Sequence, residues 1–392
     1  MRQFLFCIFL CVASMLPQAL CARDIDPLFG DTIDRTADDF VLASLCYAEP
    51  TDAVDDLFGI AGHCFFRMQC PAFNLDYCFS YESETVKGQL GRFLAGDLYM
   101  GMFAIPTDEY LDDFRKWKRS VHEYSLNLSP SEKQELWKAL DDAIAQGSKL
   151  RFDLIKRGCC ISLVHFIQDV IAPGSISYPV WPDRFNKTRR ELMYDYLVDY
   201  PWERLVIFTL LGGTFDETCP KQEKLILPVD LTDIWQKAEF NGKPLISYKG
   251  DIVTATHEEH HEPVTPVMLA WLVFIITLAL SFTKFPVFDW LLLTYQAVVG
   301  LVLIYLFFLS NIPDHANAWQ VVLFNPLPAL LWHWRKWWRI PYSFVLLIWV
   351  LFMLCSPHKI IEPTHLIFAL SIMVICLKEP VRTAIHKYVG RS

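Results

Sequence analysis

Apolar residues are concentrated toward the two ends of this chain, while the middle alternates between apolar and polar positions. After Pro266, long apolar runs occupy residues 267–282, 288–309, 319–332, 342–355 and 363–377. A hydrocarbon layer of about 30 Å needs roughly 20 helical residues to cross it. Two of these runs are long enough alone, and three span only with their aromatic flanks or lie re-entrant. The pattern predicts a helical membrane domain of about five spans.

The loops between these runs differ in charge. Every second loop is basic, with Lys284, then Arg335, Lys336 and Arg339, then Lys378, Arg382, Lys387 and Arg391 in the tail. The other loops hold Asp314 with His315, and Lys359 with Glu362. Because basic loops favour the cytoplasmic side, the bias predicts five spans, an external N-terminal domain and a cytoplasmic C-terminus.

The N-terminal apolar segment predicts a secretory signal. Met1 and Arg2 precede an apolar run over residues 4–16, and Ala19-Leu20-Cys21-Ala22 supplies a cleavage site near residue 21 or 22. We therefore expect a signal peptide at 1–22, a soluble external domain at 23–262 and the membrane domain at 263–392.

In the external domain, segments of strand and helix character alternate, which predicts the α+β class. Strands are expected at 41–47, 59–69, 76–81 and 121–128, and helices at 107–118, from 129 to about 147, and from 159 to about 172. The second helix begins at Ser129-Pro130-Ser131-Glu132, an N-cap followed by Pro at the first helical position and an acid in the first turn. Pro173-Gly174 ends the third.

Composition narrows the class of protein. The 392 residues are 53% hydrophobic, too apolar for an ordinary cytosolic protein, and the formal net charge of −9 gives no support for nucleic-acid binding. The external domain contains seven cysteines: Cys46, Cys64, Cys70, Cys78, Cys159, Cys160 and Cys219. An odd number leaves at least one thiol free or bonded to another chain. In an oxidising compartment a free thiol is buried or kept for chemistry, and we expect Cys159 to be that thiol.

Two segments suit covalent catalysis. His63 lies on an expected strand, and Cys159 opens an expected helix. A thiol becomes a strong nucleophile when an imidazole takes its proton and a helix N-terminus stabilises the thiolate. The pair predicts a Cys/His hydrolase or acyltransferase, with histidine before cysteine as in a permuted papain-like site.

The partners of this pair are less determined. A simple hairpin register puts Ser80 opposite His63, where it could orient the imidazole, and a slip by one residue would select Phe79 or Tyr81 instead. On the helix, Cys160 points about 100° away from the preceding thiol. Periodicity alone does not choose between the two cysteines.

Residues 257–261, His-Glu-Glu-His-His, form a rival signal because they match the H-E-x-x-H pattern of zinc metalloproteases. That pattern needs a stable helix that holds both histidines on one face. This segment is polar all round, follows Val253-Thr254-Ala255-Thr256 and precedes Pro263. We interpret it as a solvated juxtamembrane linker and expect neither a metal nor a cofactor.

Three further polar residues are candidate lipid contacts. Arg189 lies in a basic segment that is most simply a helix face, although it could meet a phosphate at a membrane surface. Asp314 and His315 lie in an external loop of the membrane domain. Because one span would suffice as an anchor, we expect five spans and this loop to help shape a lipid pocket.

Several spaced blocks together resemble a known family. They are Asp55-Asp56-Leu57-Phe58-Gly59-Ile60-Ala61-Gly62-His63, Arg119-Ser120-Val121 through Ser129, Phe152-Asp153 through Gly158-Cys159, Pro201-Trp202 through Gly212-Gly213, Ile226-Leu227-Pro228, and Pro313-Asp314-His315 through Asn325-Pro326-Leu327. In this order they resemble the Lnb-type lipoprotein N-acyltransferases over most of the mature chain. The family pattern reads Asn-Cys and a small residue, where this chain has Gly158-Cys159-Cys160, so the resemblance assigns the nucleophile to Cys159. Ser80 stands where the family tends to carry Asn.

This resemblance implies a permuted papain-like external domain, akin to the NlpC/P60 and lecithin:retinol acyltransferase group, in the bacterial periplasm above the inner membrane. The implied activity is acyl transfer. Cys159, with His63 as base, takes an acyl chain from a membrane phospholipid as a thioester, and the amine of a diacylglyceryl-cysteine lipoprotein accepts it.

Three other functions remain open. One is a phospholipase or amidase, which would use the same cysteine and histidine. Another is an NlpC/P60-type peptidase, against which five spans argue. The third is a non-catalytic envelope scaffold, against which the odd thiol argues only weakly.

Overall fold

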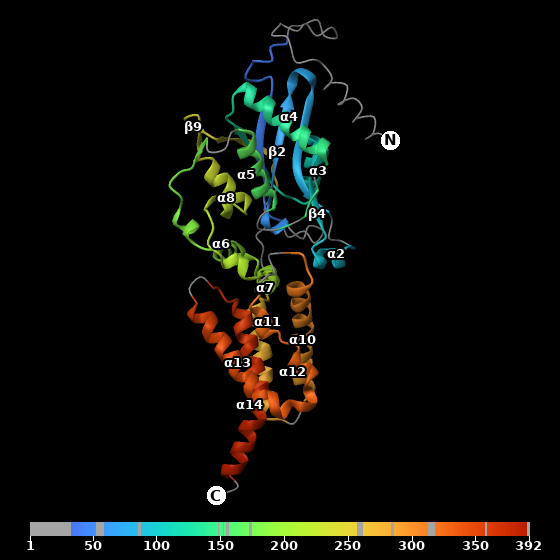
Figure 1. The fold of residues 1–392 in the computed structure, drawn as a ribbon, viewed down its shortest axis with the longest axis vertical. Helices are drawn as coiled ribbons and strands as arrows, with labels where there is room; N and C mark the ends of the chain where they lie inside the picture. Colours follow the sequence, from blue (N-terminus) through green and yellow to red (C-terminus); the bar gives the residue numbers. More distant parts are fainter. Residues whose placement is uncertain are drawn as a thin grey trace.

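The computed structural model describes residues 33–51, 59–84, 88–147, 149–151, 153, 157–171, 175–256, 262–283, 286–312, 318–356 and 359–389, with side chains to 383. The predicted signal peptide, the zinc-like motif at 257–261, and Asp314 with His315 lie outside these residues. The described chain has α+β architecture, with a sheet domain at one end and a helical part at the other (Figure 1).

A seven-stranded sheet with antiparallel neighbours forms the centre of the first domain. Its order is β10-β5-β1-β2-β3-β4-β6, with bounds β1 Leu42–Ala48, β2 His63–Cys70, β3 Leu75–Ser83, β4 Tyr99–Pro106, β5 Val121–Leu126, β6 Leu150–Arg151 and β10 Ile246–Val253. A small second sheet joins β7 Ile176–Ser177, β8 Glu239–Phe240 and β9 Lys243–Pro244. The four strands expected from the sequence are confirmed as β1, β2, β3 and β5, whereas β4 and β10 were not predicted.

The alternation of side chains in β2 separates the two faces of the sheet. Cys64, Phe66 and Met68 enter a large apolar core together with residues of α4 Pro130–Gln146, α5 Cys159–Val170 and α8 Pro228–Trp235. Phe65 points to the other face, where it stacks on Phe114 of α3 Thr107–Lys116. Successive strand residues point to opposite faces, so β2 contributes side chains to the apolar cores on both faces of the sheet.

Capping residues set where helices α4 and α6 begin. Ser129 accepts a hydrogen bond from the Glu132 backbone N–H, and the Glu132 carboxylate accepts one from the Ser129 N–H, so the predicted cap of α4 is a full capping box. The helix ends at Gly147, which adopts φ 61°. The same reciprocal cap, formed by Thr188 and Glu191, begins α6 Arg189–Tyr196.

The second part of the chain is a bundle of apolar helices. They are α9 Pro266–Ser281, α10 Val287–Phe308, α11 Gln320–Leu323, α12 Leu327–Leu330, α13 Arg335–Cys355 and α14 Pro363–Val389. Three described segments are long and apolar enough to cross a membrane: Val287–Phe308, Trp332–Cys355 and Pro363–Thr383. The runs at 267–282 and 319–332 form shorter helices, so five spans stay a prediction.

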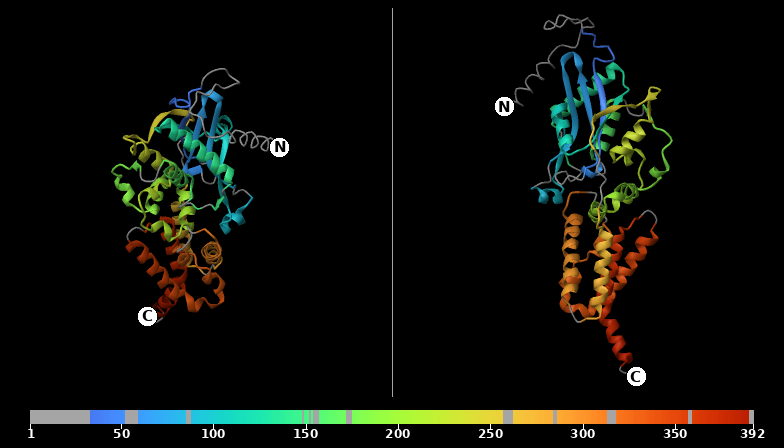
Figure 2. Two further views of the ribbon diagram at one scale, coloured as in Figure 1. Left: turned by 45° about the horizontal axis from the view of Figure 1, so that its top comes forward. Right: turned by 180° about the vertical axis from the view of Figure 1, so that it is seen from behind.

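Between the sheet and these helices lie α2 Leu90–Ala95, α6 and α7 Pro201–Leu210, and the C-terminus lies at the end of the bundle farthest from the sheet (Figures 1 and 2). A buried ion pair joins Arg204 of α7 to Glu362, just before α14, at 2.9 Å. The Gln320 amide donates to the carbonyls of Phe208 and Leu211 at the end of α7. The two parts are therefore fastened by buried polar contacts.

Candidate active site

His63 begins β2 at the end of the sheet that faces the helical bundle (Figure 1). The preceding residue, Gly62, has φ 76°, and a Cβ there would lie 3.0 Å from the Ala48 carbonyl oxygen and 3.1 Å from the Tyr47 ring. Because an L side chain is strained at that φ and would also crowd these atoms, glycine suits the turn that brings the chain into β2. Gly62 thus fixes where the imidazole enters.

The register between β2 and β3 differs from the simple one expected. Cys70 pairs with Leu75 and Phe66 with Phe79, and continuing this ladder places Glu82, rather than Ser80, across from His63. Ser80 and Glu82 share a face because they are two residues apart. The expected contact forms even so: His63 Nε2 lies 2.7 Å from Ser80 Oγ.

Glu82 and Tyr110 extend this contact into a network that the sequence analysis missed. Glu82 Oε1 lies 3.5 Å from His63 Nε2. The Tyr110 hydroxyl, on α3, donates to the Glu82 carboxylate and lies 3.0 Å from Ser80 Oγ. The period of two along β3 could have indicated Glu82. Tyr110 gives no such local signal.

Cys159 is the first residue of α5, after the N-cap Gly158, whose backbone is extended at φ −69° and ψ 163°. Its half-buried side chain lies close enough to His63 for the imidazole to lower the pKa of the thiol. The structure thus brings Cys159, His63 and Ser80 together.

Cys160 lies behind this pair, in the core. Its Sγ is 3.9 Å from that of Cys159, and burial and the neighbouring Cys64 raise the pKa of its thiol. Both Cys160 and Cys64 are 1% exposed or less. The choice that periodicity left open is therefore made by packing, because only Cys159 faces the imidazole. All seven cysteines of this domain are free thiols.

The pKa values of the site reflect these contacts. Burial alone would lower the pKa of His63, but the neighbouring Cys159 and Glu82 raise it to about 10. Burial alone would raise the pKa of Glu82, but His63, Tyr110 and Ser80 lower it to about 2. For Cys159, the hydrogen bond with Cys160 and burial outweigh the effect of His63, so the pKa of the thiol is raised well above its usual value. Cys159 and, after it, the Glu82 carboxylate therefore favour the protonated imidazole.

Comparison with known proteins finds a match for the helical part of the chain. Residues 257–388 match the family model described as the Lnb transmembrane domain. The helical part of this chain therefore contains an Lnb-type transmembrane domain. No curated protein and no solved structure matches it. The candidate site, formed by His63, Ser80, Glu82, Tyr110 and Cys159, lies outside the matched range.

Other candidate residues lie away from the Cys159 thiol. Arg189 is 6% exposed, and its Nε donates to the Glu223 carbonyl oxygen at 3.1 Å. This contact fits the structural interpretation of that residue. His165, on α5, lies 3.2 Å from the Glu223 carboxylate. Among the described residues, no group of three or more His, Cys, Asp or Glu side chains could hold a metal ion.

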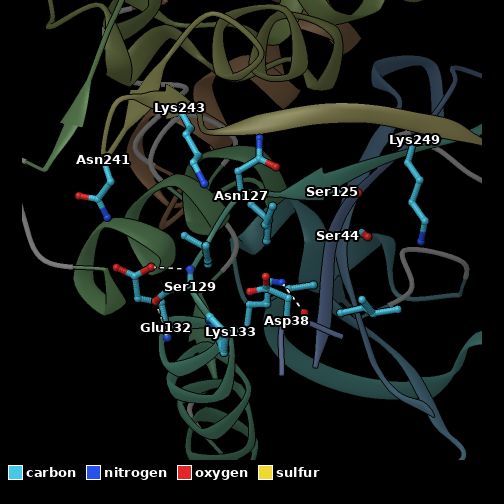
Figure 3. A pocket seen from close by; sticks show the side chains of 15 residues that line it. Asp38, Ser44, Ser125, Asn127, Ser129, Glu132, Lys133, Asn241, Lys243 and Lys249 are labelled. Atoms are coloured by element: carbon cyan, nitrogen blue, oxygen red, sulfur yellow. Dashed lines mark hydrogen bonds between the residues drawn. The ribbon is translucent and has the colours of Figure 1, made fainter. Parts of the chain in front are cut away.

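A cavity of about 560 Å³ lies at the far end of the seven-stranded sheet. Its polar lining includes Ser44, Ser125, Asn127, Ser129, Lys243 and Lys249 (Figure 3). Strand β1 runs from this cavity, at Leu42, to Ala48, which pairs with His63. The length of β1 thus separates the cavity from the thiol, and the cavity is no part of the candidate active site.

Proposed function

We propose that this protein is a lipoprotein N-acyltransferase with Cys159 as nucleophile and His63 as its base. The observation that carries the proposal is the contact of a thiol at a helix N-terminus with an imidazole that Ser80 and Glu82 hold from behind. That arrangement activates a thiol for acyl transfer. The match to the Lnb transmembrane domain supports a membrane enzyme.

The position of the pair relative to the helical bundle supports a lipid substrate. Ile60, three residues before His63, is buried with Phe208 of α7 and Leu227 before α8, and Ile360 of the loop before α14 packs against the same cluster. The strand that carries His63 is therefore braced against the membrane part. Substrates anchored in the bilayer would reach this end of the sheet first.

The first half-reaction forms a thioester. His63 takes the proton of Cys159, and the sulfur attacks the carbonyl carbon of a phospholipid acyl ester. The tetrahedral intermediate then expels the glycerol oxygen, which takes up the proton from His63, and a lysophospholipid leaves. The backbone N–H of Cys159 has no partner within α5 because it belongs to the first turn, so it is the oxyanion donor in this proposal.

The second half-reaction transfers the chain. The α-amine of a diacylglyceryl-cysteine lipoprotein attacks the thioester carbonyl, His63 accepts the amine proton, and the Cys159 thiolate leaves and is protonated again. The product is an N-acylated, triacylated lipoprotein. The reaction needs no cofactor, because the donor ester and the amine supply every bond that changes.

The proposal also fixes an orientation. A signal peptide at 1–22, an external domain at 23–262 and a membrane domain at 263–392 with five spans would put the site in the periplasm and the C-terminus in the cytoplasm of a bacterial inner membrane. Asp314 and His315 would lie on the periplasmic side, where they could contact lipid. A reporter enzyme fused to the C-terminus, after residue 392, and one inserted in the external domain, before residue 262, should report opposite sides of the membrane.

Mass spectrometry of lipoproteins from cells depleted of this protein tests the function. We expect the N-terminal amide-linked chain to disappear, with fragmentation locating the chains that remain. A gain of one chain in the presence of the protein supports a separate phospholipid donor, whereas an unchanged number of chains with one moved to the amine assigns the donor to the lipoprotein itself. Free fatty acid without lipoprotein change would favour a phospholipase, and unchanged acylation would remove the hypothesis.

Substitutions test the roles. Cys159→Ser and His63→Ala should each reduce acyl transfer by roughly a thousandfold or more, because members of a nucleophilic pair act as a unit. Cys160→Ala should retain most of the activity. The reverse result, with Cys160→Ala inactive and Cys159→Ser active, would assign the nucleophile to the other cysteine.

A further inference from the structure

A second cluster of polar and aromatic side chains lies at the end of the membrane part away from the sheet. A cavity of about 290 Å³ opens there, lined by Pro286, Val287, Trp290, Trp332 and Arg335. Two candidate spans, Val287–Phe308 and Trp332–Cys355, both begin at this cavity. The cavity therefore lies at a boundary of the apolar layer, on the side opposite to the sheet domain (Figure 1).

Two guanidinium groups pack against one indole beside this cavity. The Cζ atoms of Arg335 and Arg339 lie 5.1 Å and 5.8 Å from the centre of the Trp332 ring. Arg339 is 3% exposed, and its Nε has no hydrogen-bond partner among the described residues. Arg335 lines the cavity and pairs with no carboxylate in the described part of the chain.

Cations outnumber carboxylates around this cavity. The described charged residues at this end are Arg335, Lys336, Arg339, Lys378 and Arg382 against Asp289 and Glu379. Both carboxylates are engaged, because Lys378 pairs with Asp289 and Arg339 Nη1 lies 2.5 Å from Glu379 Oε2. An excess of positive charge thus remains at Arg335, which lines the cavity and has no carboxylate partner among the described residues.

We propose that this cavity binds the phosphate of an anionic lipid headgroup in the leaflet opposite to the sheet domain. The planar guanidinium of Arg335 donates two hydrogen bonds to phosphate oxygens, and Trp290 and Trp332 pack against the glycerol at the level where indoles favour the interface. A zwitterionic headgroup would add a cation to a cluster with excess cations, so anionic lipids bind more tightly. This site does not depend on the acyl-transfer activity.

The test uses the full-length protein in a neutral detergent, titrated with phosphatidylglycerol or phosphatidylcholine, with bound lipid counted by native mass spectrometry. We expect Arg335→Gln to weaken phosphatidylglycerol binding about tenfold or more, since a charge-assisted contact is lost. Arg335→Lys keeps the charge but loses the planar fork and the stacking on Trp332, so its affinity should fall between those of Arg335→Gln and the wild type.

Lys336→Gln is the matched control, because it removes the same charge one residue further on, from an exposed side chain that does not line the cavity. Equal weakening by Lys336→Gln and Arg335→Gln would overturn the proposal in favour of diffuse attraction, as would phosphatidylcholine binding as tightly as phosphatidylglycerol. The unfolding temperature of Arg335→Gln, measured without lipid, identifies a folding defect. If that variant is defective, the test uses Arg335→Lys instead. If inorganic phosphate alone raises that temperature as much as phosphatidylglycerol, the headgroup assignment is wrong.

Discussion

The side chains that touch Cys159 act on its thiol in opposite directions. Cys160, 3.9 Å away between sulfurs, raises the pKa of the thiol, and His63 lowers it. Glu82 in turn favours the protonated form of His63. The reactivity of the nucleophile therefore depends on two residues that take no part in bond making.

Replacing Cys160 by Ala should make Cys159 more reactive. The substitution removes the hydrogen bond that most raises the pKa of the Cys159 thiol, so a larger fraction is thiolate at pH 7, up to about tenfold for each unit by which the pKa falls. The measurement is the rate of iodoacetamide modification at residue 159, followed by peptide mass spectrometry. Slower modification than in the wild type would contradict the role given to Cys160.

Glu82→Gln should destabilise the protein most in mildly acidic solution. The pKa of Glu82 is about 2 in the folded protein, against an ordinary value of 4.5. Its ionised form therefore contributes to folding stability above pH 4.5, and this contribution is lost as the pH falls through about 2. The pKa of His63 is about 10 in the folded protein, against an ordinary value of 6.5. Its protonated form therefore contributes fully to folding stability below pH 6.5, and this contribution is lost as the pH rises through about 10. Both contributions are therefore full only between about pH 4.5 and 6.5.

In that window we expect a loss of about 1 kcal/mol, because 37% of the Glu82 side chain is exposed and solvent screens the pair. Unfolding temperatures measured from pH 5 to 10 should converge with the wild type toward pH 10. Glu84→Gln is the control, since Glu84 pairs with Arg92 rather than with His63. A pH-independent difference for Glu82→Gln would show that the pair does not form.

Helices α11 and α12 form a broken segment that packs closely on α10. The break falls at Phe324-Asn325-Pro326, and the amide of Gln296, on α10, donates to the Leu323 carbonyl freed by it. The hydroxyl of Tyr342, on α13, donates to the same carbonyl. In an apolar layer every backbone polar group needs a partner inside the protein, so these two side chains make the break tolerable.

Gly300→Ala tests this packing. A Cβ on Gly300 would lie 1.7 Å from the Phe324 carbonyl oxygen, and a backbone atom cannot move aside cheaply. We expect a loss of about 1–3 kcal/mol or more from overpacking, measured as a lower unfolding temperature in detergent.

The control for Gly300→Ala is Gly91→Ala in helix α2, where a Cβ meets nothing within 4 Å. That change should leave stability equal or slightly higher, because alanine favours helix over glycine. Unchanged stability in Gly300→Ala would mean that the broken segment does not lie against α10.

The sheet domain and the membrane part behave as one assembly because buried polar groups cross the junction. Arg204 of α7 also packs over the Tyr194 ring, 4.6 Å from its centre, and Glu362 is 1% exposed. Thr209 Oγ1 lies 2.9 Å from His365 Nε2 of α14. These contacts set the height of the candidate site above the helices.

Arg204→Met should therefore loosen the whole molecule. It leaves the Glu362 carboxylate buried without its partner, which costs about 3–5 kcal/mol. Adding Glu362→Gln should recover much of this loss, because no unpaired charge remains. Thermal unfolding of the two variants in detergent measures the difference, and a double variant no more stable than the single one would show that the ion pair does not hold the junction.

The sequence by itself determined many of the elements and predicted a type of chemistry. Strand-like segments located β1, β2, β3 and β5, the cap at Ser129 located the start of α4, and apolar runs located the membrane part. These signals are local, since each depends on neighbours within a few residues. The same is true of the motif blocks that indicated the Lnb family.

The tertiary structure alone decided which side chains meet. Ser80 and Glu82 both reach His63, Tyr110 approaches from α3, and Cys160 lies beside Cys64 in the core. Such contacts join residues far apart in the sequence, and a shift of one residue in strand register would exchange the faces. Register and packing follow from the summed burial of the whole core, which no short stretch of sequence contains.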